Sequence, residues 1–553
     1  MHLRDLVKER VLAALTRAQT EQLLPSIPLP EDLVERPQNT LRGDFASSAP
    51  LKLARTMHMN PMEIAQTIVK FINTENIISD IEIASPGFIN ITVSSEWLQE
   101  QVDIILNSGD LFGSADGGKG QSIQVEYVSV NPTGPLHVGH ARGAVLGSVL
   151  SSVLDAAGYQ VSREYYLNDA GNQIDLFHQS LFATYSQALG KDVQIPDNGY
   201  KGHYMIELGR QMAEQHGSKF LELQTDEGVS ALGSIGVDRM VQEIKNDLDN
   251  LQVSFDVWFS EKSLYTEDYY ETTMKTLEDA GYVSKREGAI WFVSSALGED
   301  KDNVLVKSTG VPTYFASDAA YHYNKFAVRN FDRVIDIWGA DHAGHVSRVK
   351  AVLGALGLDP DRLDIIIGQM VSLKRNGETV RVSKRTGDMI TLKELVEEVG
   401  SDACRFFFLA RSADAQMDFD LELAVKQSQD NPVFYLQYAY ARMAGIIRNA
   451  EENKHDLTTG DVHLLSTAEE LTLIRHLMML PEVIDSIAQT MEPHHLPHYT
   501  MELAVAFHSF YDRCRVISEN EELTSARLKL TKASKINLGR CLSLMGINAP
   551  ERM

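Results

Sequence analysis

The sequence predicts an α/β fold in which a parallel-sheet domain is flanked by an N-terminal α+β domain and a C-terminal all-α helical bundle. Three observations support this prediction. Between residues 120 and 420, short apolar strand patterns alternate with helix patterns, which is typical of parallel sheets with helical crossovers. Residues 1–112 mix both patterns. From residue 430 to residue 553 nearly every segment has helical periodicity.

In the N-terminal domain, helix patterns cover Leu3–Gln19 and Pro61–Ile72, and strand patterns cover Ile81–Ala84 and Phe88–Val93. The stretch 113–120, GSADGGKG, is typical of a linker. We therefore expect the first domain to end near residue 112.

The central domain has four candidate strands with helices between them. The strands are Ile123–Val130, Val161–Tyr166, Arg333–Trp338 and Leu363–Ile367. Helix patterns cover Ala141–Ala157 and Gly344–Leu356. Residues from about 190 to 305 interrupt the alternation with acidic, helical sequence, and we expect an insertion there. Because ligands of such sheets bind beyond the carboxyl ends of the strands, the loops that follow the strands are the candidate site.

Composition indicates an ordinary globular protein of 553 residues, 44% hydrophobic and 23% charged. The three cysteines have no CxxC spacing, which predicts neither a disulfide framework nor a zinc site and fits a cytoplasmic location. The N-terminus is amphipathic and carries acids, so it does not have the pattern of a signal peptide. No apolar run approaches the length of a membrane span, and no membrane partner is expected.

The net charge of −25 argues against a general affinity for nucleic acids. The charge is uneven, however, because no acid occurs between Glu522 and Glu551. The cations of this segment are Arg527, Lys529, Lys532, Lys535 and Arg540. Such a patch can bind phosphates even in an acidic protein. A charged helix exterior is the alternative.

One motif has the arrangement of a phosphate site. The turn formers 131–135 end a strand pattern, and His137-Val138-Gly139-His140 opens the next helix pattern. A helix start offers free N–H donors and a positive dipole end, and two imidazoles could add donors. Gly139 would let a flat base or ribose lie against the backbone. Alone, the motif fits surface or capping histidines equally well.

A second motif, TVRVSKRTG at 379–387, follows a predicted hairpin turn at 374–378. Alone, it would be a solvated basic turn. Together the two motifs resemble the signatures of class I aminoacyl-tRNA synthetases, in which Lys384 matches the catalytic lysine. The chain has RVSK where the family has KMSK, since Arg381 and Val382 replace Lys and Met. This difference leaves the dynamics of the loop open.

The chain resembles the arginyl-tRNA synthetases of bacterial type over nearly its whole length. The matching segments are 43–54, 86–94, 137–174, 314–322, 338–349, 401–424 and the terminal APERM. The resemblance implies a Rossmann-like catalytic domain, an N-terminal domain that touches the tRNA elbow, and a bundle that binds the anticodon. It further implies that Mg·ATP and L-arginine form arginyl-adenylate and pyrophosphate, and that the arginyl group then passes to tRNA(Arg) with release of AMP. Arginine activation in this family needs bound tRNA.

The resemblance also assigns site residues. The catalytic residues are His137, His140 and Lys384. The ATP-binding residues are His137, Gly139, His140, Gly339, Asp341, His342, Ser383 and Lys384. The arginine-binding residues are Glu126, Asn131, Tyr314, Asp318 and His345, the last standing where some relatives carry Gln. Without the resemblance, Asp318 would be a helix-cap acid, and Tyr314 and Asn131 would be core or turn residues. Asp341 and His342 have metal-ligand residue types, but no third ligand is evident, so no protein metal site is predicted.

For tRNA, the expected contacts are Tyr435, Tyr438, Arg442, Arg448, Lys529, Lys532 and Met553. Helical spacing would make some of these tyrosines core residues instead. We expect a monomer whose partners are tRNA(Arg), arginine and ATP.

Three other classes of function are less consistent with the sequence. Another nucleotidylyltransferase with an HxGH site would be short and would lack a helical tail. A cysteine enzyme of the same class would need a zinc thiol site, and a glutamate enzyme would need cations where Glu126 and Asp318 stand. A tRNA-binding scaffold would have lost His137, His140 or Lys384.

Overall fold

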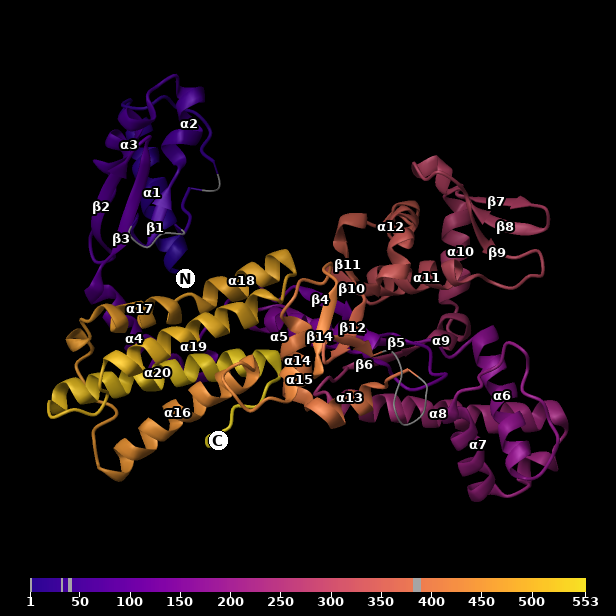
Figure 1. The fold of residues 1–553 in the computed structure, drawn as a ribbon. Coiled ribbons are helices and arrows are strands. Elements are labelled where there is room, and N and C mark those ends of the chain that lie inside the picture. Colours follow the sequence, from indigo (N-terminus) through magenta and orange to yellow (C-terminus); the bar gives the residue numbers. More distant parts are fainter. Residues whose placement is uncertain (1, 31–32, 38–41, 381–388) are drawn as a thin grey trace.

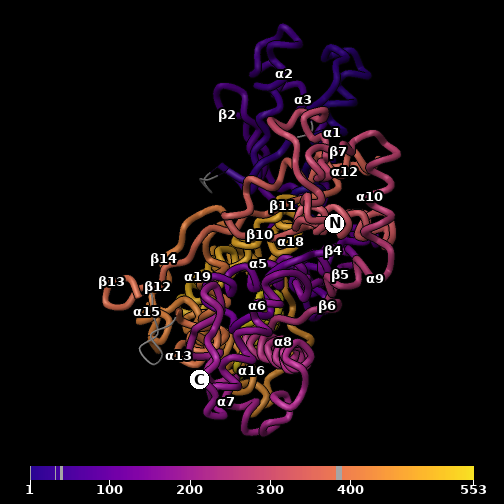
Figure 2. The backbone as a smooth tube through the Cα atoms, turned by 90° about the vertical axis from the view of Figure 1, so that its right-hand side faces the viewer, coloured from indigo at the N-terminus to yellow at the C-terminus, as the bar shows by residue number. Residues whose placement is uncertain are grey.

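The computed structural model describes residues 2–30, 33–37, 42–380 and 389–553, which form three domains (Figure 1). The N-terminal domain is α+β, as predicted. Its antiparallel sheet has the order β1-β3-β2 and consists of β1 (Phe45–Ser47), β2 (Ile78–Ala84) and β3 (Phe88–Val93). The helices beside it are α1 (Leu3–Thr20), α2 (Ala49–Met57) and α3 (Pro61–Val69). Figure 2 shows this domain projecting from the rest of the molecule.

The central domain contains the predicted parallel sheet, in the order β11-β10-β4-β5-β6. Its strands are β4 (Ser122–Glu126), β5 (Gln160–Leu167), β6 (Val257–Ser260), β10 (Arg333–Gly339) and β11 (Leu363–Gly368). The helix α5 (Val138–Ala156) follows β4 and is buried on nearly every side, because it packs between the sheet and helices of the C-terminal part. This confirms the Rossmann-like α/β class.

The predicted insertion at about 190–305 is not one piece, because β6 lies inside it and pairs with β5. Between β5 and β6 come α6 (Asn172–Ala188), α7 (His203–His216) and α8 (Thr225–Asn250). After β6 come α9 (Glu261–Thr266), α10 (Tyr269–Asp279), β7 (Val283–Arg286), β8 (Ala289–Phe292), β9 (Asn303–Val306) and α11 (Tyr314–Tyr323). Figure 1 shows the α6–α7 pair and the β7–β9 sheet as separate projections. A four-residue strand, half-buried throughout, gives too little pattern to be recognised.

The remaining elements of the central domain form its junction with the bundle. The predicted hairpin is present as β12 (Val371–Arg375) and β13 (Glu378–Val380), and β14 (Met417–Asp420) pairs with β12. The helices here are α12 (Val346–Ala355), α13 (Leu392–Val399), α14 (Ser401–Leu409) and α15 (Leu421–Val425). The motif residues Ser383, Lys384 and Arg385 lie outside the described residues.

The C-terminal domain is the predicted helical bundle. Its helices are α16 (Pro432–Glu452), α17 (Ala468–Leu477), α18 (Leu480–Thr490), α19 (His495–Arg513) and α20 (Glu521–Met545). Asn431 caps α16 by accepting a hydrogen bond from the Val433 N–H at 3.0 Å. The helix α4 (Ser95–Ser108), which follows the N-terminal sheet, packs against α17 and α20. In the part of the chain that the structure describes, no helix has the length and apolarity that a membrane crossing requires.

One buried side chain ties the central domain to the bundle. Arg405 on α14 is 1% exposed. Its guanidinium donates to the Leu251 carbonyl at 2.9 Å and to the Met545 carbonyl, which belong to the C-terminal ends of α8 and α20. It also donates to Ser148 Oγ on α5 at 3.1 Å. Helix ends leave carbonyls without intrahelical partners, and Arg405 satisfies two such ends at once.

Candidate active site

A cavity of about 1480 Å³ opens at the carboxyl ends of β4, β5 and β10. It brings together ten of the predicted residues: Glu126, Asn131, His137, His140, Tyr314, Asp318, Gly339, Asp341, His342 and His345. Cavities that enclose one small ligand are typically about 300–1000 Å³, so this one has room for a nucleotide beside a second small molecule. Its position agrees with the rule for open α/β sheets.

The two motif histidines lie at the N-terminus of α5. His137 is the N-cap, and its Nδ1 accepts a hydrogen bond from the Gly139 N–H at 3.1 Å. Nδ1 of His140 accepts one from the His137 N–H at 3.3 Å. Because both Nδ1 atoms accept, each neutral ring carries its proton on Nε2. The two rings stack with centroids 3.5 Å apart.

Burial determines the charge of these rings. It lowers the pKa of His137, and it lowers that of His140, with help from His137, to about 3. Both rings are therefore neutral donors near pH 7. A Cβ at Gly139 would lie 3.0 Å from Cε1 of His137, so glycine leaves the ring room to fold over the helix start. Gly139 itself does not line the cavity.

The loop after β4 has unusual backbone angles. Strand β4 ends at Glu126, before the predicted Val130, and Val128 and Ser129 have φ values of +71° and +42°. Left-handed backbone is disfavoured for a β-branched residue, so this turn is strained at the wall of the cavity. Ser129 Oγ accepts from the Tyr166 N–H at 3.0 Å, which holds the turn against β5. Asn131, beyond the turn, donates to Gln173 of α6.

The segment after β10 forms the opposite wall. Here Asp341 and His342 are exposed, and His345 is half-buried. A Cβ at Gly339 would lie 2.6 Å from Asp341 Oδ1, so glycine leaves room for this carboxylate beside the strand end. Among the described residues, the group of three potential metal ligands, Glu492, His494 and His495, lies outside this cavity.

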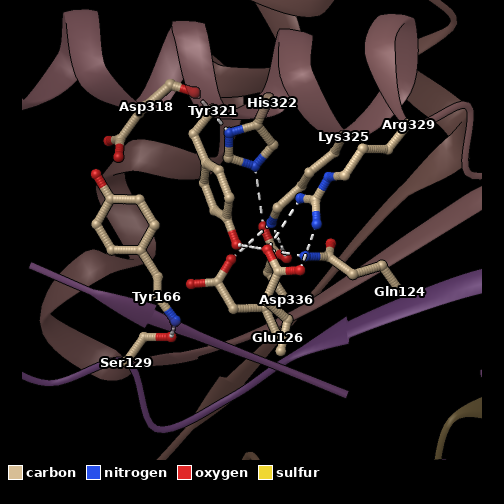
Figure 3. A network of polar contacts seen from close by, with 11 residues as sticks. Gln124, Glu126, Ser129, Tyr166, Asp318, Tyr321, His322, Lys325, Arg329 and Asp336 are labelled. Carbon is tan, nitrogen blue, oxygen red and sulfur yellow. Dashed lines mark hydrogen bonds and ion pairs between the residues drawn. The ribbon is translucent and has the colours of Figure 1, made fainter. Parts of the chain in front are cut away.

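The third wall combines α11 with three strands (Figure 3). On α11 and the π-helical turn Asn324–Val328 that continues it, side chains three, four and seven residues apart face the sheet. These residues are Asp318, Tyr321, His322 and Lys325. Opposite them, Glu164, Glu126 and Asp336 stand in register on β5, β4 and β10. The three buried acids on the strands thus face three donors on the helix side, Tyr321, His322 and Lys325.

The contacts between these rows are short and buried. Lys325 Nζ donates to Glu126 Oε2 at 2.6 Å and to Asp336 Oδ1 at 2.8 Å. His322 Nε2 lies 2.9 Å from Asp336 Oδ2. Glu164 accepts from the Tyr321 hydroxyl at 2.5 Å and from the Arg329 guanidinium.

The charges of this network follow from these contacts. Burial would raise the pKa of Asp336, but Lys325 and His322 hold it at about 2. Burial lowers the pKa of Lys325, yet the carboxylates of Asp336 and Glu126 outweigh it and the net direction is upward. Burial raises the pKa of Glu126. Lys325 lowers this pKa and Asp336 raises it, and the net direction is upward.

Glu261 was not predicted from the sequence, although it lines the cavity beside Tyr166, Ser317 and Asp318. It begins α9, and Asp169 holds this junction by accepting from Ser260 Oγ at 2.6 Å. Its side chain is buried, Oε2 has no hydrogen-bond partner among the described residues, and burial raises its pKa to about 7. The sequence signal for Glu261 is its position directly after β6, and β6 was not among the strands predicted from the sequence.

Asp318 is partly buried, and no described side chain forms an ion pair with its carboxylate. Asp318 and Glu261 therefore present to one cavity two acids that form no ion pair with a described residue. Since isolated buried charges are costly, this pair favours a cationic ligand. Tyr314, 58% exposed, stands at the rim of the same region.

A second cavity, of about 990 Å³, lies in the bundle. It is lined by Tyr438, Arg442, Arg448 and Met553, together with residues the sequence did not single out: Tyr511, Arg513, Arg515 and Arg552. Tyr435 does not line this cavity; its ring packs against His508 with centroids 4.9 Å apart.

The basic run of α20 differs from the expected exposed patch. Lys529 is 7% exposed; it donates to the Gly460 carbonyl at 2.9 Å and pairs with Asp103 of α4 at 2.7 Å. Arg527 pairs with Glu470, and Lys535 pairs with Glu551. Only Lys532 among these lysines is well exposed. Lys529 therefore holds two helices together instead of facing a ligand.

Comparison with known proteins identifies the family. Residues 5–93 match the arginyl tRNA synthetase N terminal domain, residues 101–421 match the class I (R) tRNA synthetase catalytic domain, and residues 436–553 match the DALR anticodon binding domain. The arginine–tRNA ligase of Dehalococcoides mccartyi is 53% identical over all of this chain and 99% of its own. That of Carboxydothermus hydrogenoformans is 47% identical over 94% of both chains.

Solved structures agree. A structure described as a putative arginyl tRNA synthetase from Campylobacter jejuni superposes with a TM-score of 0.76 at 34% identity, covering 83% of this chain and 100% of that one. The Thermus thermophilus arginyl-tRNA synthetase, 21% identical, shares the fold over the full length of both chains with a TM-score of 0.78. This chain belongs to the arginyl-tRNA synthetases, class I ATP-utilising enzymes whose family reaction is the aminoacylation of tRNA(Arg).

Proposed function

We propose that this chain ligates L-arginine to tRNA(Arg) in the cavity at the carboxyl ends of β4, β5 and β10. One observation carries the proposal: the cavity joins neutral imidazole donors at a helix start to two acids that form no ion pair with a described residue. The first feature suits a phosphate, and the second suits a guanidinium. Both substrates of adenylate formation thus have a place in one cavity.

In this proposal the arginine side chain lies between Asp318 and Glu261, with Tyr314 at the rim. Glu126 and Asn131 hold its α-amino end, nearer the β4 loop, with His345 across the cavity. ATP lies along Gly339, Asp341 and His342 and directs its phosphates to the start of α5. Mg²⁺ enters with ATP as part of the substrate.

The arginine carboxylate then attacks the α-phosphorus, an oxygen–phosphorus bond forms, and pyrophosphate leaves. His137 and His140 donate from Nε2 to phosphate oxygens as charge shifts to the leaving group, while α5 contributes its dipole. Lys384, outside the described residues, is assigned to the β- and γ-phosphates. The terminal ribose hydroxyl of tRNA next attacks the arginyl carbonyl, and AMP leaves.

The bundle cavity is assigned to the anticodon arm, with Tyr438, Arg442, Arg448 and Met553 as its contacts. Lys532 and Tyr435 do not line this cavity and are assigned to tRNA contacts outside it. Aromatic rings and guanidinium planes suit unstacked bases of single-stranded RNA loops. The N-terminal domain is assigned to the tRNA elbow. We assign the protein to the cytoplasm as a monomer.

Pyrophosphate exchange across the amino acids, with and without tRNA(Arg), tests the proposal. We expect exchange with arginine and none with lysine or glutamate. Exchange driven by another amino acid, or none with arginine in the presence of tRNA, would contradict it.

A further inference from the structure

We propose that Lys325 is a positioning residue for arginine: by binding one oxygen of Glu126, it keeps that carboxylate ionised and turns it toward the substrate. This inference deepens the proposed function and rests on it. Lys325 is 0% exposed and lies on the π-helical turn after α11, out of contact with solvent.

Lys325 belongs to a continuous chain of hydrogen bonds. His322 Nδ1 lies 2.8 Å from the Asp318 carbonyl oxygen, and His322 Nε2 lies 2.9 Å from Asp336 Oδ2. Asp336 accepts from Lys325 at 2.8 Å, and Lys325 donates to Glu126 at 2.6 Å. The chain therefore connects two residues that line the cavity, Asp318 and Glu126 (Figure 3). It reaches Asp318 through the backbone carbonyl and Glu126 through the carboxylate.

Hydrogen-bond roles fix the charge of the chain. His322 Nδ1 faces a carbonyl and Nε2 faces a carboxylate, and both of these groups only accept. Both ring nitrogens must therefore donate, which makes His322 a cation. The buried acids Glu126, Glu164 and Asp336 are then balanced by His322, Lys325 and Arg329.

This balance separates two kinds of acid in one cavity. Neither Asp318 nor Glu261 forms an ion pair with another described residue, so both supply attraction for a cation. The negative charge of Glu126 is already balanced by Lys325, so this carboxylate orients the substrate and adds no net charge to the cavity. Its orientation comes from Lys325, whose ammonium is itself held by Asp336 and by the face of the Tyr321 ring, 4.1 Å away.

Removing the ammonium should change both geometry and protonation. In Lys325→Met, Glu126 and Asp336 would stand side by side on adjacent strands without the cation between them. Two such carboxylates share a proton. The groups that face Glu126 are Asp336 on β10, Glu164 and Tyr166 on β5, and Asp318, Tyr321 and His322 on α11. Among these groups His322 is the cation, and both of its ring nitrogens are already bonded, to Asp318 and to Asp336.

The test is arginine affinity, measured on the full chain by calorimetry and as KM in aminoacylation, from about pH 6.5, roughly half a unit below neutrality, to about pH 9, roughly two units above it. For Lys325→Met we expect arginine to bind about tenfold or more weakly near pH 7, with the KM for ATP unchanged. The loss should shrink as pH rises, because deprotonation restores Glu126. Arg329→Met is the matched control, since Arg329 balances Glu164, which does not line the cavity.

The double variant Glu126→Gln/Lys325→Met removes one negative and one positive charge, so it avoids the unpaired buried charge that could prevent Lys325→Met from folding. If Lys325 acts through Glu126, its effect on arginine affinity disappears in the Glu126→Gln background. An unchanged arginine affinity in Lys325→Met, or an equal effect of Arg329→Met on arginine, would overturn the inference alone. A wild-type protein that binds no arginine would overturn the proposed function instead.

Discussion

Two clusters of charge, one around the central cavity and one along α20, have opposite arrangements. In α20, Arg527, Lys529 and Lys535 each have an acidic partner on another segment. In the cavity, neither Asp318 nor Glu261 forms an ion pair with a basic side chain among the described residues. Paired charges close an interface, whereas charges held without partners are suited to a ligand. The partner of a charged side chain, more than its abundance in the sequence, separates structure from function.

The largest effect is expected at the unpaired acids. Asp318→Asn should lower kcat/KM for arginine roughly thirty- to several-thousand-fold, because the guanidinium loses a charged partner. This corresponds to a loss of about 2–5 kcal/mol of binding free energy. Steady-state aminoacylation with varied arginine measures this. Asp341→Asn, on the exposed ATP wall, is the control and should leave the KM for arginine alone. Similar kinetics for Asp318→Asn and the wild type would place the guanidinium elsewhere.

Lys384→Ala should raise the activation free energy of adenylate formation by about 2–4 kcal/mol and leave the fold intact, since one charge contact is lost in the transition state. Single-turnover measurements with tRNA present would detect it. Lys374→Ala offers a comparison on the same hairpin, because Lys374 is already bonded to Thr379 at 2.9 Å. If Lys374→Ala is the slower variant, the motif assignment of Lys384 is wrong.

Glu261 should make arginine binding depend on pH. Its pKa is raised by burial to about 7, so it is protonated below that pH and ionised above it. A guanidinium binds the ionised form, hence affinity should fall as pH drops through about 7, approaching tenfold per unit, or about 1.4 kcal/mol. Glu261→Gln should be weaker throughout and should flatten the profile. A wild-type profile that is flat between about pH 5.5 and 8.5, roughly 1.5 units on each side of this value, would exclude the role.

The smallest effects should separate the two basic regions of the bundle. Arg448→Ala, in the bundle cavity, should raise the KM for tRNA and reduce the salt slope of binding by about one unit if it contacts a phosphate. Lys529→Met should instead lower stability by about 1 kcal/mol and leave tRNA binding unchanged, because its partners are Gly460 and Asp103. Binding isotherms at several salt concentrations and thermal unfolding decide between them. Weakened tRNA binding in Lys529→Met with normal stability would reverse the comparison.

The sequence predicted what depends on local pattern. The strands at β4, β5, β10 and β11, the hairpin at 374–378 and the helix start at the HVGH motif are confirmed, because alternation, turn residues and caps act over a few positions. The three-domain organisation is likewise present in the fold.

The parts that were missed depend on distant partners. Lys325 and Glu126 are 199 residues apart, and Lys529 and its partner Asp103 are farther still. No periodicity in one sequence joins such pairs. Glu261 was missed with β6, whose four half-buried residues show no alternation. The helical spacing of Asp318, His322 and Lys325 was visible, but nothing local indicated that acids on three strands would face it.

The Arg405 contact also bears on biosynthesis. A ribosome makes α14 well before Met545, whose carbonyl Arg405 binds 140 residues later in the chain. Domains usually fold as they emerge. Here the nascent central domain carries a guanidinium whose site is completed only when α20 has formed. A message truncated before α20 would yield a sheet domain with buried donors left unbonded, at a cost of about 1–3 kcal/mol for each such group and more where it is charged. Such a product would be unstable and open to proteolysis. The bundle therefore contributes to the stability of the catalytic domain before any tRNA is bound.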